Sequence, residues 1–255
     1  MIDLHCHVLP GIDDGPETIA GSLELVRASA AAGVRTIVAT PHVSWRYQNG
    51  AEAIAAAVAE LRARLDEEGM EVEVCAGAEV AITHLEEIDR AELARLGLGG
   101  GGWILLEPPF SPVAPAVGRM IASVQHSGMR VLLAHPERCP AFQRDPEMLR
   151  SLVQGGVLTS LTAGSLVGRF GGSVRRLAVS LLRDGLAHNV ASDAHDVAGR
   201  APGIRAELME SGFGGLVDWL AQDVPAAILA GSEIPPRPDV GRSGASSGRR
   251  WRLTR

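Results

Sequence analysis

The sequence predicts an α/β fold, a distorted seven-stranded parallel (β/α) barrel similar to a TIM barrel. Short apolar runs rich in β-branched residues alternate along the 255-residue chain with Ala-, Leu-, Arg- and Glu-rich segments of helical periodicity. Strands that alternate with helices are typical of parallel βα units. Seven such units favour a barrel over an open sheet, and 46% hydrophobic residues are enough for a large core.

The predicted strands are short and apolar, and the predicted helices carry an apolar stripe. In residues 51–68, for example, Ile54, Val58, Leu61 and Leu65 fall on one face of a helix. The strands are expected to begin near Ile2, Val34, Val72, Trp103, Arg130, Val157 and His188. The main helices are expected at residues 17–32, 51–68, 115–127, 146–154 and 173–183.

The chain is expected to form one domain with a short tail. Residues 1–235 contain all the predicted strands and helices. After Pro235 the composition changes to Pro, Gly, Ser and Arg, which is typical of a disordered segment. We therefore predict a domain over residues 1–235 and a disordered basic tail over residues 236–255.

Composition argues against several classes of partner. The formal net charge is -6, so nothing in the bulk composition attracts nucleic acid or an anionic membrane, although every basic residue is Arg. No stretch approaches the roughly 18–20 apolar residues that a membrane span needs. Asp3 and His5 stand where a secretory signal peptide would begin, and they argue against one. Three cysteines are too few, and odd in number, to form a disulfide framework. We therefore expect a cytoplasmic protein, and its oligomeric state stays open.

Histidines and carboxylates recur where the predicted strands end. In a parallel barrel the C-terminal ends of the strands converge on one face, where active sites form. Residues spread over most of the chain can therefore share one site. Within the first strand, alternation turns His5 and His7 to one side and Cys6 to the other, and Asp193 and His195 show the same spacing. The candidates are His5, His7, His42, Glu79, Glu107, His135, Asp193 and His195.

Imidazoles and carboxylates without thiolates form a donor set that suits Mn, Fe, Zn or Mg. These candidates exceed what one ion needs, so two or three ions that share carboxylate bridges are the simplest explanation. Ions held about 3.5–4 Å apart can stabilise both the attacking and the leaving oxygen of a phosphoryl transfer, and they lower the pKa of bound water. The pattern therefore predicts a metal-dependent phosphoester hydrolase.

The three cysteines do not indicate a cysteine phosphatase, which would place Arg six residues after the nucleophile. Ile12, Ala81 and Asp145 stand at those positions after Cys6, Cys75 and Cys139. We interpret the three cysteines as structural.

Six motifs together carry a resemblance to a known family. They are MIDLHCH followed by LPGIDDGP in residues 1–16, ATPH in residues 39–42, GAEV in residues 77–80, ILLE in residues 104–107, HPER in residues 135–138 and ASDAH in residues 191–195. In order and spacing the chain resembles the PHP (polymerase and histidinol phosphatase) superfamily over roughly residues 1–230. More narrowly, it resembles the bacterial manganese-dependent protein-tyrosine phosphatases of capsule and exopolysaccharide loci.

The resemblance implies a trinuclear site, with manganese as the expected metal and Fe, Zn or Mg as alternatives. One ion would be held by His5, His7, Glu79 and Asp193, and a second by Glu79, Glu107 and His135. A third would use His42 and His195 with Asp14, although Asp13 stands beside it and the choice between the two stays open. Arg138 and Arg200 match positions that the family uses near the substrate phosphate.

The resemblance also implies a substrate, phosphotyrosine on a bacterial tyrosine kinase that controls polysaccharide export. Another PHP activity, such as histidinol-phosphate or nucleotide phosphoester cleavage, is the alternative enzyme. A non-catalytic metal-binding regulator is the alternative outside enzymes, and the intact candidate ligands argue against it. Residues 44–47 depart from the more polar segment usual in the family and are expected to affect how a substrate ring or peptide is held.

Deleting residues 240–255 is expected to leave the melting temperature and the turnover of a small substrate nearly unchanged. A Pro-, Gly-, Ser- and Arg-rich segment cannot bury enough apolar surface to order itself. Thermal unfolding of the full-length and shortened proteins tests this expectation. A drop of many degrees would mean that the tail packs on the domain or mediates assembly.

Overall fold

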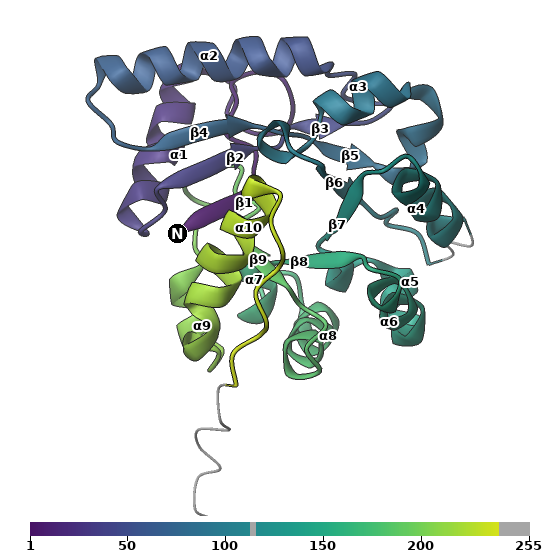
Figure 1. The fold of residues 1–255 in the computed structure, drawn as a ribbon. Helices are drawn as coiled ribbons and strands as arrows, with labels where there is room; N and C mark the ends of the chain where they lie inside the picture. The colour runs from purple at the N-terminus through teal and green to yellow at the C-terminus, as the bar shows by residue number, and fades with distance from the viewer. Residues whose placement is uncertain (113–115, 240–255) are drawn as a thin grey trace, which may run out of the picture.

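The computed structural model describes residues 1–112 and 116–239, and its strands lie at the centre of the molecule with helices around them (Figure 1). Within those residues, nine strands form two parallel sheets, ordered β1-β2-β4 and β3-β5-β6-β7-β8-β9. This arrangement confirms the α/β class and the parallel pairing. The strands are β1 Ile2–Cys6, β2 Thr36–Ala39, β3 His42–Val43, β4 Glu73–Ala76, β5 Glu79–Ala81, β6 Trp103–Glu107, β7 Arg130–Ala134, β8 Leu158–Thr162 and β9 Asn189–Ala191.

The segments predicted as the second and third strands each contain two short strands, so the described residues hold nine strands where seven were predicted. The second breaks between β2 and β3 at Pro41, which has no N–H to donate to a strand ladder. The third breaks between β4 and β5 at Gly77, where a Cβ atom would lie only 2.8 Å from Cγ1 of Val38. At both breaks the chain changes from the smaller sheet to the larger one.

The first and last strands meet, although no regular ladder joins them. Cys6 and Ala194 form an isolated parallel bridge. The Asp193 N–H donates to the His5 carbonyl at 2.8 Å, and the His7 N–H donates to the Ala194 carbonyl at 2.9 Å. The buried Asp3 carboxylate also accepts hydrogen bonds from the Ser192 backbone and hydroxyl. The two ends of the chain segment that carries the candidate ligands are therefore held together.

The predicted helices are present with small shifts at their ends. Residues 17–32 contain α1 Ile19–Ala31, 51–68 contain α2 Ala51–Glu67, 115–127 contain α4 Val117–His126, and 146–154 coincide with α6 Pro146–Gln154; α8 Gly172–Arg183 begins one residue before its prediction. Pro115 lies outside the described residues. The short helices α3 Arg90–Arg95, α5 Pro140–Arg144, α7 Ala163–Leu166, α9 Arg205–Glu210 and α10 Val224–Ala230 were not predicted. The 3₁₀ segments η1 Ile82–Glu87, η2 Leu98–Gly100, η3 Pro136–Arg138 and η4 Gly214–Leu216 and the π-helical segment η5 Trp219–Asp223 complete the described elements.

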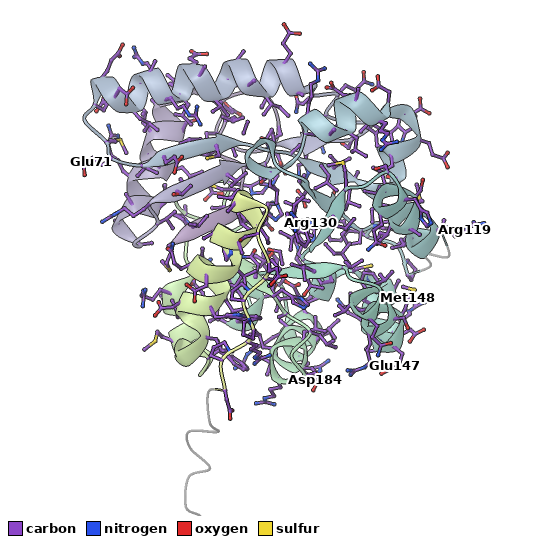
Figure 2. All side chains as sticks on the ribbon, in the orientation of Figure 1. Glu71, Arg119, Arg130, Glu147, Met148 and Asp184 are labelled. Carbon is purple, nitrogen blue, oxygen red and sulfur yellow. The ribbon has the colours of Figure 1, made fainter. Side chains whose placement is uncertain are left out.

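The outer faces of the helices carry the charged residues. Figure 2 shows the exposed side chains of Glu71, Arg119 and Glu147 projecting outward at the edge of the molecule. Along α2, the predicted stripe of Ile54, Val58, Leu61 and Leu65 is buried. This pattern is typical of helices that cover a central sheet.

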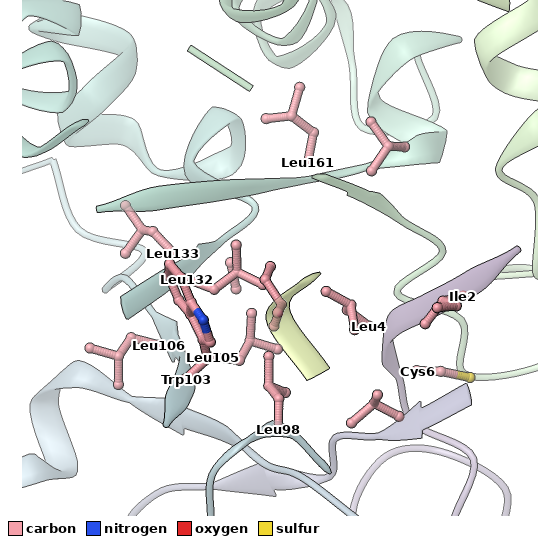
Figure 3. Close-up of a cluster of buried hydrophobic side chains, with 14 of the residues drawn as sticks. Ile2, Leu4, Cys6, Leu98, Trp103, Leu105, Leu106, Leu132, Leu133 and Leu161 are labelled. Carbon is pink, nitrogen blue, oxygen red and sulfur yellow. The ribbon is translucent and has the colours of Figure 1, made fainter. Parts of the chain in front are cut away.

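The register of the strands puts apolar side chains and candidate ligands on the same face. Leu105 of β6 pairs with Leu132 of β7 on one side and with Glu79 of β5 on the other. Glu79 in turn pairs with His42 of β3. Leu106 and Leu133 lie on the opposite face of β6 and β7 (Figure 3). Glu107 follows Leu105 by two residues, so strand alternation returns it to the face of Leu105. That face is therefore apolar along the strands and ionisable at their C-terminal ends.

The described chain continues beyond the predicted domain boundary for a few residues. The Trp219 indole N–H donates to the Pro235 carbonyl at 3.0 Å, and the Arg237 guanidinium lies near Gly185 and His188. Residues 240–255, most of the predicted tail, lie outside the described residues. None of the helices in residues 1–112 and 116–239 combines the length and apolarity required to cross a membrane.

Candidate metal centre

The structure brings together all nine residues that were singled out as candidate ligands. They form four overlapping groups, and within each group the potential ligand atoms lie within 4.8 Å of one another. The groups are His7, Asp14, His42 and His195; His5, His7 and Asp193; His5, Glu79 and His135; and His42, Glu79 and Glu107. Glu79 is the carboxylate that belongs to two of these groups, as expected of a ligand that bridges neighbouring ions.

His5, His7, Glu79 and Asp193 surround one small space with four donor atoms. Nε2 of His5 lies 3.1 Å from Nε2 of His7 and 3.2 Å from Oε2 of Glu79. The remaining measured separations, from the two imidazoles to Glu79 and Asp193, are 3.3, 3.4 and 3.6 Å. Donors on a tetrahedron with bonds of about 2.1 Å are roughly 3.4 Å apart. The separation between the two imidazoles and their separations from each carboxylate are therefore those expected of ligands on one ion.

Glu79 also faces a second group of donors. Its Oε1 atom lies 2.7 Å from Nε2 of His135, and its Oε2 atom lies 3.0 Å from Nδ1 of His42. The Glu107 carboxylate is somewhat farther away, at 3.9 Å from His42 and 4.0 Å from His135. One buried carboxylate thus lies between two sets of donors, which is the position of a bridging ligand.

The geometry distinguishes Asp14 from Asp13. Oδ1 of Asp14 lies 3.4 Å from Nε2 of His42 and 3.3 Å from Nε2 of His195. Asp13 instead accepts a hydrogen bond of 2.7 Å from Nδ1 of His7. Such a contact fixes the imidazole orientation and leaves Nε2 free to bind a cation. Asp14 is therefore the candidate ligand, and Asp13 orients His7.

Asp3 is a supporting residue that the sequence argument missed, and Asp13, which it left open as a ligand, also has a supporting role. Asp13 also accepts from the backbone N–H groups of Gly15 and His42, so it ties the loop after β1 to the start of β3. Asp3 accepts from the His5 N–H as well as from Ser192. Asp3, His5 and His7 follow one another at two-residue spacing, so the pattern that selected the two histidines could also have found Asp3. For Asp13, the sequence signal for a place at the site was its position next to Asp14.

Two candidate ligands stand where the backbone is strained. His135 has φ 28° and Asp193 has φ 52°, and among the described residues they are the non-glycine residues with positive φ. This conformation is unfavourable for residues with a Cβ atom and concentrates at functional sites. Asp193 therefore does not reach the site through strand alternation with His195, as the sequence suggested, because β9 ends at Ala191 and the chain turns sharply at Asp193.

The electrostatics of the site favour cations. The site gathers four candidate carboxylates, Glu79, Glu107, Asp14 and Asp193, and two guanidinium groups that both pair with Asp193, so carboxylates outnumber arginines. Burial and the nearby Glu79 carboxylate raise the pKa of Glu107 to about 7. Burial lowers the pKa of His7, but the Asp13 and Glu79 carboxylates outweigh it and raise that pKa to about 10.

Two buried carboxylate oxygens at the centre make no hydrogen bond of good geometry, although an imidazole nitrogen lies within 3.4 Å of each. They are Oε2 of Glu79 and Oδ1 of Asp193, and both residues are at most 1% exposed. Burying an anionic oxygen without a partner is costly, and a coordinated cation removes that cost. The donor types, their spacing and these unpaired oxygens all fit divalent metal ions.

Arg138 and Arg200 reach the same carboxylate from different loops. Oδ2 of Asp193 accepts from Arg138 at 2.7 Å and pairs with Arg200 at 2.6 Å. Arg200 also donates to Nε2 of His195 at 2.7 Å, on the nitrogen that would bind a cation. Both guanidinium groups are partly exposed, so each keeps donors for an anion at the edge of the metal site.

Comparison with known proteins gives the family. The model of the family described as capsular polysaccharide synthesis, CpsB/CapC, matches residues 1–214. This protein belongs to the CpsB/CapC family. The tyrosine-protein phosphatase YwqE of Bacillus subtilis (strain 168) is 35% identical over 244 residues, which cover 93% of this chain and 96% of YwqE.

Two further comparisons extend the family assignment. The tyrosine-protein phosphatase CpsB of Streptococcus pneumoniae is 28% identical over 210 residues, which cover 79% of this chain and 86% of that protein. A chain from the crystal structures of YwqE and of pneumococcal CpsB, described as unique metal-dependent tyrosine phosphatases, superimposes with a TM-score of 0.81 at 33% identity. The match covers 93% of this chain and 99% of that one. The family comparison confirms the resemblance seen in the sequence motifs.

Replacing Glu79 by Ala should cost more metal than replacing Glu107, because Glu79 lies between two donor groups. The wild-type protein, purified without chelator, should hold about two to three equivalents of transition metal, and Glu79→Ala should lose more than one. Glu107→Ala should lose about one, since its carboxylate approaches one donor group. Elemental analysis measures the content, with exposed Glu147→Ala as the control. Equal losses from Glu79→Ala and Glu107→Ala would rule out the bridging role.

Proposed function

We infer that this protein is a metal-dependent tyrosine-protein phosphatase that acts in capsular or exopolysaccharide synthesis. The observation that carries the inference is the convergence of nine metal-type donors beside two arginines in a member of the CpsB/CapC family. The relatives YwqE and CpsB are named tyrosine-protein phosphatases, and both cover most of this chain. The activity is thus supported by the family and by the donor set independently.

We propose that the site lies at the C-terminal rim of one distorted seven-stranded barrel. In this interpretation β2 and β3 are two parts of one interrupted strand, as are β4 and β5. The bridge between Cys6 and Ala194 closes the ring between the first and last strands. All nine candidate ligands then lie within or after the C-terminal parts of the strands at one end of the barrel, the end where barrel enzymes form their active sites.

We propose that the donors divide into three sites as the family resemblance implies, and these sites overlap the four groups described above without coinciding with them. His5, His7, Glu79 and Asp193 would hold one ion; Glu79, Glu107 and His135 a second; and His42, His195 and Asp14 a third. Bound divalent cations would supply an activated water nucleophile and neutralise developing charge on the phosphoryl group. We propose Mn²⁺ as the metal, with Fe, Zn or Mg as alternatives, because the donors mix imidazole with carboxylate.

The chain's own residues position the phosphate. Arg138 and Arg200 converge on Asp193 Oδ2, so an incoming phosphate at this edge meets two guanidinium groups. Guanidinium groups bind phosphate through paired, charge-assisted hydrogen bonds. Thr162 Oγ1 also donates to Asp193, at 3.3 Å, and keeps that carboxylate in place if the arginines turn toward substrate. Anion binding and cation binding therefore meet at Asp193.

We propose phosphotyrosine on a tyrosine kinase of polysaccharide export as the physiological substrate, and the cytoplasm as the location. Histidinol phosphate is the alternative substrate, because related metal sites cleave it. A non-catalytic metal-binding regulator is the alternative outside enzymes. The two unpaired buried oxygens and the complete donor set favour an active site over a site that has lost its function.

Turnover by the metal-loaded protein decides among these functions. The wild type with added Mn²⁺ should hydrolyse a phosphotyrosyl peptide with a far higher kcat/KM than histidinol phosphate. Exhaustive chelation should abolish release of phosphate, and Mn²⁺ should restore it better than Mg²⁺, which demands near-ideal octahedral geometry. Phosphate release is measured for each substrate. Activity that survives chelation would refute the metal mechanism, and a preference for histidinol phosphate would refute the substrate assignment.

Replacing Arg138 should weaken catalysis without emptying the metal site. A charge-assisted hydrogen bond to phosphate contributes about 1.5–3 kcal/mol, so Arg138→Ala should lower kcat/KM for the phosphotyrosyl peptide by at least about tenfold. Metal content should stay at the wild-type level, because Arg138 offers no metal ligand. Arg119→Ala, an exposed arginine on α4, is the matched control. An unchanged kcat/KM would remove Arg138 from the site.

A further inference from the structure

Three exposed apolar side chains closely follow candidate metal ligands in the sequence. Four large hydrophobic residues are exposed in the part of the chain that the structure describes: Trp45, Phe110, Val197 and Met209. Trp45 follows His42 by three residues, Phe110 follows Glu107 by three, and Val197 follows His195 by two. Only Met209, on α9, does not follow a candidate ligand closely. Exposed apolar surface beside a strongly charged site indicates contact with an apolar group of a ligand.

The Phe110 ring contacts both a candidate metal ligand and a candidate phosphate ligand. Its ring lies 5.7 Å from the ring of His135, at an interplanar angle of 25°. The Arg138 guanidinium carbon lies 5.3 Å from the centre of the same ring. Phe110 nevertheless remains 54% exposed. It therefore has free surface immediately beside a candidate metal ligand and a candidate phosphate ligand.

The other aromatic residues near the site contact different partners. Tyr47 stacks on His42 at 5.7 Å with an angle of 11°, and the Arg46 guanidinium carbon lies 5.0 Å from the centre of the Tyr47 ring. Trp45 donates its indole N–H to the Thr83 carbonyl and makes an edge contact with His84. Phe170 lies under Arg138 at 4.4 Å. None of these contacts occupies Phe110.

We propose that Phe110 determines specificity for aryl phosphates, by packing against the aromatic ring of phosphotyrosine while Arg138 binds the phosphate. This inference rests on the proposed function and names the substrate feature that the site selects. Aromatic rings pack with their centres roughly 4.5–7 Å apart. A phosphate bound to Arg138 is close enough to Phe110 to bring the attached ring within that range. An alkyl phosphate has no ring to offer, so it gains nothing from Phe110.

The first test measures substrate preference in the manganese-loaded enzyme. The ratio of kcat/KM for a phosphotyrosyl peptide to kcat/KM for the matching phosphoseryl peptide should fall about tenfold in Phe110→Ala, because the ring contact and its buried area are lost. Phe110→Tyr should retain the ratio, since it keeps the ring. Met209→Ala, which removes an exposed apolar side chain elsewhere, should leave the ratio unchanged. Metal content is measured for every variant.

The second test measures binding without turnover. Phenylphosphonate and methylphosphonate carry the same anionic group and differ in the ring. Calorimetry should show that wild-type protein binds phenylphosphonate more tightly, and that Phe110→Ala loses most of this difference while Phe110→Tyr keeps it. Equal weakening for both phosphonates would overturn the proposal, because Phe110 would then act by holding Arg138 or His135. An unchanged difference would overturn it as well.

The outcomes separate this proposal from the function on which it depends. A wild type that does not hydrolyse the phosphotyrosyl peptide would refute the phosphatase assignment, whatever the variants do. A wild type that prefers the phosphotyrosyl peptide, with the same preference in Phe110→Ala, would leave the phosphatase assignment intact and refute the role of Phe110.

Discussion

The buried carboxylate of Glu79 is the interaction on which the rest of the site depends. It is fully buried, yet His5 and His135 lower its pKa well below the usual range, against the effect of burial. Its two oxygens face different groups of imidazoles, so one side chain connects the ligands of β1 with those that follow β7. A charge at this depth is tolerable only with cationic partners. Metal binding and the integrity of this region of the fold are therefore linked.

The interrupted strands are part of how the site forms. β3 begins with His42 and β5 begins with Glu79, and these residues pair in register immediately after the two breaks. The Glu79 N–H donates to the Pro41 carbonyl at 3.1 Å. This hydrogen bond connects the break before β3 with the break before β5. Pro41 cannot donate, and Gly77 makes room for Val38. His42 and Glu79 thereby each begin a new strand, and both side chains belong to the candidate metal groups.

Much of this arrangement could be predicted from the sequence, because strand alternation and strand ends obey simple geometry. That logic placed His5 beside His7 and grouped ligands from distant positions. It could not find the breaks at Pro41 and Gly77, which depend on contacts between neighbouring strands. It also misjudged how Asp193 reaches the site, since a positive φ at a non-glycine residue is imposed by tertiary contacts. The choice of Asp14 over Asp13 needed the position of His7, which only the folded chain provides.

Asp193 connects the cation-binding and anion-binding sides of the site. Its Oδ1 atom lies near His5 and His7, whereas Oδ2 receives Arg138, Arg200 and Thr162. A phosphate that engages the two arginines must share them with this carboxylate, so part of the binding energy is spent on weakening existing contacts. The same contacts hold the guanidinium groups in place before substrate arrives, which lowers the entropy cost of binding. The contacts of Asp193 therefore lower the affinity for phosphate and at the same time preorganise the two arginines. Selectivity between substrates must then come from contacts with the rest of the substrate.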